Sequence, residues 1–116
     1  MEKIVFRGKK IPFDITARPY CDTYEKATDA LKSGYDELAK KESIEISDSL
    51  NLMEEFLTKV FGKEKLSEIF SSEGPTLIDY FELADLMLGA INKQSTKLKK
   101  LSDSVHAKLI PFSEAK

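Results

Sequence analysis

Nucleophilic catalysis by this chain would have to use Cys21 and His106, since it contains one cysteine and one histidine. A cysteine nucleophile needs a histidine within hydrogen-bond reach, but these residues are 85 positions apart and no local motif joins them. A zinc site needs three or four Cys, His or carboxylate ligands, and the chain lacks the soft ones. We therefore interpret Cys21 as a packed side chain and His106 as a residue near a helix C-terminus.

Paired carboxylates are the other residues whose types and spacing could do chemistry, as a general acid and base. Asp79, Glu82 and Asp85 recur at three-residue steps, which places them along one stripe of a helix. Acid–base catalysis needs carboxylates that converge on a pocket in different environments, whereas such a stripe is typical of a solvated face. No phosphate-binding G-x-x-x-x-G-K motif occurs. The sequence therefore argues against an enzyme and predicts no cofactor and no metal.

The composition indicates a single, highly charged domain. The chain has 116 residues, of which 41% are hydrophobic and 33% charged, and its formal net charge is −2. This length suits one modest core, and one cysteine excludes an intramolecular disulfide. No apolar run has the length of a membrane span or of a signal peptide. We expect a cytoplasmic protein that has no membrane partner.

Two short β-rich runs, at residues 3–7 and 11–15, predict an N-terminal hairpin with its turn at 8–10. The second run alternates apolar and other residues, which is the period of a half-buried strand. Because proline cannot donate a ladder hydrogen bond, Pro12 places this strand at an edge or shortens it. A two-stranded hairpin is marginal alone, so we expect it to lie on the helices.

Helical periodicity dominates the rest of the chain. Asp22 and Glu25 resemble a capping box, which predicts that the first helix opens there. Residues 40–49 are expected to connect it to the second helix, which Gly62 should end in a left-handed cap. Thr76 and Asp79 should cap the last helix. The predicted helices cover residues 22–41, 50–61, a short stretch around 66–70, and residues from 77 until Pro111 ends the last one. The fold class is mainly α, with about four helices, an N-terminal hairpin and a long C-terminal helix.

This last helix changes character halfway along. From Leu77 to Ile91, 11 of 15 residues are apolar, so this half should be packed on most of its surface. From Asn92 onward the apolar residues form one narrow stripe. The pattern over residues 77–109 would be about 50 Å long, wider than a domain of this size, so part of it should project or fold back. We divide the chain into a helical domain, 1–94, and a helical extension of the same domain, 95–116.

The narrow stripe is the candidate binding surface. Apolar residues between Ala84 and Val105 alternate three- and four-residue steps over about three heptads, near the minimum for a coiled coil, with one polar position, Gln94. The pattern fits equally well a stripe that folds back on the first helix and one that binds a partner or a second copy. The partner-binding candidates are Leu98, Leu101, Val105 and Leu109, which we call the seam, with Lys97, Lys99 and Lys100 beside them.

The charges of this chain are unevenly distributed, so an electrostatic contribution to binding would be local to one segment. Five lysines against Asp103 give the segment from Lys93 to Lys108 a charge of +4, which fits either a solvated face or salt-sensitive attraction. The helices around the turn at Gly74-Pro75 superficially resemble a helix-turn-helix. The helix after that turn is almost wholly apolar, however, and offers no arginine or asparagine to base edges. The sequence does not favour nucleic acid as a partner.

A set of short motifs between residues 11 and 94 resembles a known family. The motifs are Phe13-Asp14, Tyr24-Glu25-Lys26-Ala27, Glu55-Phe56, Val60-Phe61-Gly62, Ile69-Phe70 and Asn92-Lys93-Gln94. They are similar to those of short proteins from phages and prophages of Gram-positive bacteria that look like tail assembly chaperones. The resemblance does not extend beyond Gln94 and supplies no functional residues.

The resemblance implies a non-catalytic protein of the bacterial host cytoplasm that binds the long helical tape-measure protein until the tail tube polymerises around it. The physics is compatible, because helical modules can cover an exposed apolar stripe by helix-in-groove packing. Two alternatives stay open. One is a small regulator or adaptor that dimerises through the same helix; the other is a virion structural protein, such as a head–tail connector, that self-assembles.

Overall fold

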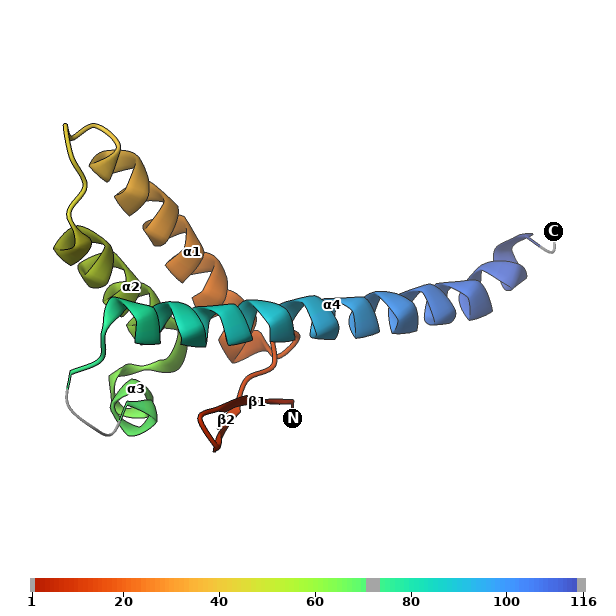
Figure 1. Ribbon diagram of the computed structural model, residues 1–116. Helices are drawn as coiled ribbons and strands as arrows, with labels where there is room; N and C mark the ends of the chain where they lie inside the picture. The colour runs from red at the N-terminus through yellow and green to blue at the C-terminus, as the bar shows by residue number, and fades with distance from the viewer. Residues whose placement is uncertain (1, 71–73, 115–116) are drawn as a thin grey trace.

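The computed structural model describes residues 2–70 and 74–114, the last five of these by their backbone alone. The protein is mainly helical, with an N-terminal hairpin, three helices beside it and one long helix that crosses the folded part and leaves it (Figure 1). The principal extents are 62 × 37 × 18 Å, so the molecule is elongated along the long helix.

The hairpin consists of β1 (Lys3–Phe6) and β2 (Lys9–Pro12), paired antiparallel with Ile4 opposite Ile11. A two-residue turn joins the strands, and both its residues, Arg7 and Gly8, have positive φ (50° and 84°), as a type I′ turn requires. The predicted bounds are wrong, because the turn lies at Arg7-Gly8 rather than at 8–10, so β1 ends at Phe6 and β2 begins at Lys9. The assigned strand ends at Pro12, although the Phe13 N–H still donates to the Glu2 C=O at 3.0 Å. Phe13 follows outside the strand and is fully buried.

Helix α1 (Arg18–Leu38) packs against α2 (Ile46–Phe61). The prediction that α1 opens at Asp22 is wrong: the helix begins four residues earlier, with Pro19 in its first turn, where a missing N–H costs nothing. Gly34 lies where the two helices meet, because a Cβ there would overlap the side chain of Leu52. The glycine that weakens α1 locally thus allows this close approach.

Helix α2 also starts earlier than expected. The connection predicted over residues 40–49 is shorter, because Glu45 and Asp48 form a capping box in which the Glu45 N–H donates to Asp48 at 3.1 Å. Gly62 ends α2 as predicted, with φ of 89°, but its ψ of 151° is extended rather than that of a left-handed cap. The short α3 (Lys63–Ile69) follows at once.

Helix α4 (Leu77–Glu114) opens on the predicted capping pair. The Thr76 N–H donates to Asp79 at 2.8 Å, and the Asp79 N–H donates to the Thr76 hydroxyl at 3.2 Å. The prediction that Pro111 ends this helix is wrong, since the helix continues to Glu114. A proline removes one helical hydrogen bond, a loss that interrupts only one turn near the end of a long helix.

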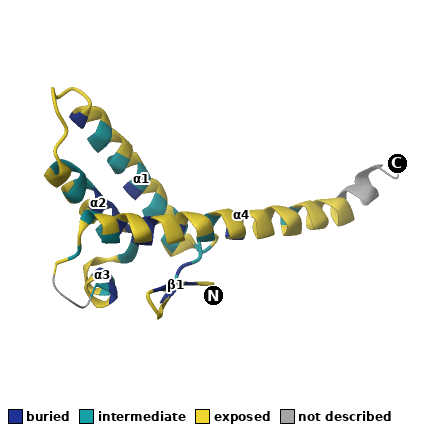
Figure 2. Cartoon of the chain, viewed as in Figure 1, coloured by how far each residue is buried: buried dark blue, intermediate teal, exposed yellow. Residues whose placement is uncertain are grey.

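The core lies where the hairpin, α2, α3 and the first half of α4 meet (Figure 2). The ring of Phe6 packs edge-on against Phe70, and Phe70 in turn against Tyr80, which joins the hairpin to both α3 and α4. The hairpin therefore lies on the helices, as expected. The largest fully buried side chains are Phe6, Phe13, Leu57, Leu83 and Met87.

Candidate binding seam and root pocket

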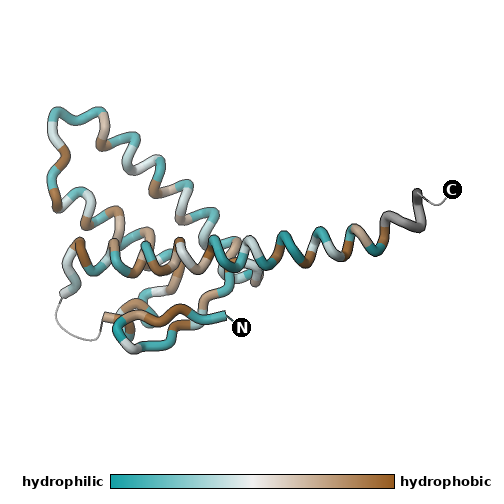
Figure 3. The backbone as a smooth tube through the Cα atoms, turned by 45° about the vertical axis from the view of Figure 1, so that its right-hand side comes forward, coloured by the Kyte–Doolittle hydropathy of each residue, from teal (hydrophilic) through white to brown (hydrophobic). Residues whose placement is uncertain are grey.

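One face of α4 packs on the core in its first half and is exposed in its second. A helix turns about 100° per residue, so Leu83, Met87 and Gln94 lie on the same face of α4 as the seam. The first three are buried, whereas the seam residues Leu98, Leu101, Val105 and Leu109 are 52%, 56%, 52% and 60% exposed. Along the projecting helix, apolar positions recur among polar ones (Figure 3).

The seam does not fold back on α1. That alternative would bury Leu98 and Leu101, and both are more than half exposed. In Figure 1, α1 runs away from the projecting half of α4. The part of the helix that the sequence expected to project or fold back therefore projects.

Gln94 marks the point at which the stripe leaves the core. Its side chain is 7% exposed, and both ends of its amide are used. The Ile15 N–H donates to its Oε1 at 2.7 Å, and its Nε2 donates to the Phe13 C=O at 2.8 Å. The one polar residue of the heptad pattern thus clamps the segment between β2 and α1 onto α4. We call this pair of bonds the Gln94 clamp.

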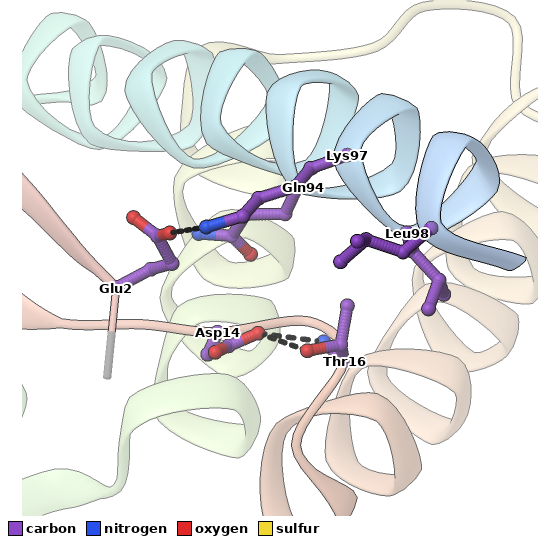
Figure 4. Close-up of a pocket in the computed structure, with 7 residues that line it drawn as sticks. Glu2, Asp14, Thr16, Gln94, Lys97 and Leu98 are labelled. Atoms are coloured by element: carbon purple, nitrogen blue, oxygen red, sulfur yellow. Dashed lines mark hydrogen bonds and ion pairs between the residues drawn. The ribbon is translucent and has the colours of Figure 1, made fainter. Parts of the chain in front are cut away.

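A small pocket opens at the root of the projection, beside the Gln94 clamp (Figure 4). Its volume is about 130 Å³. This is below the roughly 300–1,000 Å³ of ordinary small-molecule sites, so it suits one side chain better than a substrate or cofactor. We call it the root pocket; its lining consists of Glu2, Asp14, Thr16, Gln94, Lys97, Leu98 and Leu101.

The polar wall of the root pocket is held in place by local bonds. Asp14 accepts a hydrogen bond from the Thr16 N–H at 3.0 Å and another from the Thr16 hydroxyl. The hydroxyl bond is the main cause that lowers the pKa of Asp14 below its usual value. Lys97 lies 3.4 Å from the Glu2 carboxylate. The pocket thus has a charged wall facing two seam leucines.

The candidate lysines differ in their position relative to the seam. At about 100° per residue, Lys97 and Lys108 lie beside one edge of the seam, while Lys99 and Lys100 lie toward the back of the helix. All four are exposed. The sequence grouped Lys99 and Lys100 with Lys97, but only Lys97 is placed to contact a helix lying on the seam.

The residues first considered for catalysis lie apart. Cys21 is half-buried near the start of α1, with its thiol 3.4 Å from the Arg18 C=O, and His106 is exposed on the projecting helix. Within residues 2–70 and 74–109, no group of three or more His, Cys, Asp or Glu side chains is placed to hold a metal ion. No helix in the described part of the chain is both long and apolar enough to cross a membrane.

Two of the three carboxylates at the start of α4, those of Asp79 and Glu82, form ion pairs in addition to facing solvent. Arg7, in the hairpin turn, forms ion pairs with Asp79 and with Glu82, the latter at 2.9 Å. Its guanidinium also lies 4.8 Å from the centre of the Phe6 ring. Sequence reasoning missed this contact, because Arg7 lies some 70 residues upstream of its partners in a segment that carries no pairing signal.

This chain matches no protein-family model, no curated protein and no solved structure.

Proposed function

We propose that this chain is a non-catalytic, helix-binding protein of the tail-assembly-chaperone type. It would hold a long helical tape-measure protein in the host cytoplasm before the tail tube assembles. The observation that carries the proposal is the exposed seam, which continues the core-facing stripe of α4 past the Gln94 clamp. The partner class comes from the motif resemblance over residues 11–94.

The seam gives a helical partner a surface that is already formed. A long amphipathic helix exposes an apolar stripe that favours aggregation, and a second helix can cover that stripe by packing into it at three- and four-residue steps. Four seam residues over about three turns form a small contact. Contacts below about 1,200 Å² are typical of weak, transient complexes, which suits a partner that must later be released.

The test is co-expression with the tape-measure-like protein encoded in the same genome. We expect the long protein to stay in the clarified lysate and to co-purify with this chain, and we expect both effects to be lost in the double variant Leu98→Asp/Leu101→Asp. Both leucines are more than half exposed, so the substitutions should remove binding without unfolding the protein.

Leu88→Asp is the matched control, because Leu88 is also an exposed leucine of α4 (46%) but lies outside the seam. It should co-purify as the unaltered chain does. Equal loss with Leu88→Asp, or unchanged co-purification with the seam variant, would contradict the proposed surface. No interaction at all, with the isolated chain forming regular oligomers, would instead favour a virion structural protein.

A further inference from the structure

The structure sets a boundary and a charge preference for whatever occupies the seam. At the core end of the seam, the Gln94 clamp holds the segment between β2 and α1 over the stripe of α4, and Asp14 and Thr16 of this segment form a wall of the root pocket. A helix that lies along the seam cannot continue past this wall toward the core. It therefore begins or ends at the root pocket and extends outward beside Leu98 to Leu109, about 16 Å or three helical turns.

The root pocket fits the terminal side chain of that helix. Leu98 and Leu101 belong both to the seam and to the pocket lining, so the apolar surface is continuous between them. The volume of about 130 Å³ holds one side chain. A regular apolar seam alone tolerates slippage by whole heptads, whereas a single distinct site at one end fixes the register.

Charge decides between a second copy of this chain and a different helix. The seam segment carries five lysines against one aspartate. Two such segments laid side by side would bring two local charges of +4 together, and Asp103, the one carboxylate between Lys93 and Lys108, lies toward the back of the helix. Like charges next to an interface disfavour that pairing. A helix with acidic residues beside its apolar stripe would instead pair with Lys108 and with Lys97, which lies 3.4 Å from the Glu2 carboxylate and would share its charge between Glu2 and the partner.

We infer that the seam and root pocket bind one amphipathic helix of another protein, about three turns long on the seam, whose apolar stripe is edged with Asp or Glu. This inference rests on the proposed function and adds the charge, the length and the register of the partner helix.

Synthetic peptides test the inference on the full chain. Two helical peptides share one apolar stripe and differ only in the residues that edge it, glutamate in one and lysine in the other. Fluorescence anisotropy at low salt should show tighter binding of the glutamate-edged peptide. Two exposed ion pairs correspond to about a threefold to tenfold difference in Kd, and added salt should reduce it.

Charge reversal on the protein is the decisive variant. Lys97→Glu/Lys108→Glu should reverse the preference, so that the lysine-edged peptide binds more tightly. Lys99→Glu/Lys100→Glu carries the same change in net charge on the far side of the helix and should only weaken the original preference. A preference that does not reverse, or that both variants change equally, would overturn the inferred pairing.

The root pocket has its own pair of variants. Thr16→Phe should fill the pocket and weaken binding of the glutamate-edged peptide, whereas Thr16→Ser keeps the hydroxyl that Asp14 accepts from and should bind normally. Equal binding of both peptides would overturn the acidic partner but leave the seam as a helix-binding surface. Binding of neither peptide would overturn this inference and the proposed function together, and self-association of the chain in that case would identify a second copy as the occupant.

Discussion

Replacing Gln94 with leucine would remove the clamp while keeping a side chain of similar size. The amide makes two hydrogen bonds, to the Ile15 N–H and to the Phe13 C=O, and the side chain is buried. One such bond contributes about 1 kcal/mol net, and a buried polar group left unpaired costs about 1–3 kcal/mol. The Ile15 N–H is only part-buried and regains water, and leucine adds apolar burial. We therefore expect the free energy of unfolding to fall by about 2 kcal/mol.

The assay is urea denaturation followed by far-UV circular dichroism. The midpoint should fall with an unchanged slope, because the surface exposed on unfolding is nearly the same. A loss of about 2 kcal/mol corresponds to roughly 10 °C in Tm for a domain of this size. Amide exchange gives a local readout, since the Ile15 N–H loses its acceptor and should exchange faster in the folded protein.

Asn92→Leu is the matched control for this prediction. It also replaces an amide of α4 with leucine, but Asn92 is exposed, and its effect should stay within about 0.5 kcal/mol. The reasoning would be refuted if Gln94→Leu cost no more than Asn92→Leu, or if exchange at Ile15 did not change. Either result would mean that water replaces the amide at no cost.

Three further predictions concern stability. Hydrogen bonds from the Thr76 N–H and then from the Arg7 guanidinium lower the pKa of Asp79 in the folded protein. The stabilising contribution of the Asp79 carboxylate is therefore complete above the unfolded pKa of about 3.9. This contribution is lost as the pH falls through the lower pKa of the folded state. Urea midpoints should fall below about pH 4, and less so in Asp79→Asn. Gly89→Ala should stabilise by about 0.5–1 kcal/mol, because no atom lies within 4 Å of a Cβ there, whereas Gly34→Ala should destabilise, because its Cβ would overlap the Leu52 side chain. Thermal denaturation compares the two. Leu98→Asp and Leu101→Asp should each leave the free energy of unfolding within about 0.5 kcal/mol of the unaltered chain, and a larger loss would show that the seam is packed in solution.

Local periodicity was sufficient to predict most of the secondary structure. The change from a broad to a narrow apolar face in the last helix predicted its packed half, because burial requires apolar residues on the buried face. It left open whether the narrow half projects or folds back on the first helix. Helix boundaries were less accurate. The sequence predicted a helix start at Asp22, but a proline fits the first turn of a helix, and α1 begins at Arg18-Pro19. The Thr23 hydroxyl, beside the expected cap, donates to the Pro19 C=O inside α1.

The site was predictable only in part. The seam lies on one helix and follows from spacing alone, but the root pocket joins Glu2, Asp14 and Thr16 to α4 and depends on how the hairpin exits across that helix. No local pattern encodes such a contact. Gln94 carried a usable signal, since a lone polar residue at an apolar position of a heptad often has a specific hydrogen-bonding role.

Because α4 runs without a break from the core through Leu109, the core nucleates the part of the helix that carries the seam. The first hydrogen-bonded turn is the costly step in helix formation, and isolated helices shorter than about 12–15 residues are marginal in water. Here that step is completed by the half of α4 that packs on α2 and the hairpin. Each residue beyond the Gln94 clamp adds only a propagation step, so a partner meets a helix that is already ordered and loses less entropy on binding. Amide exchange should therefore rise gradually from Lys97 to Leu109, rather than abruptly at the edge of the core.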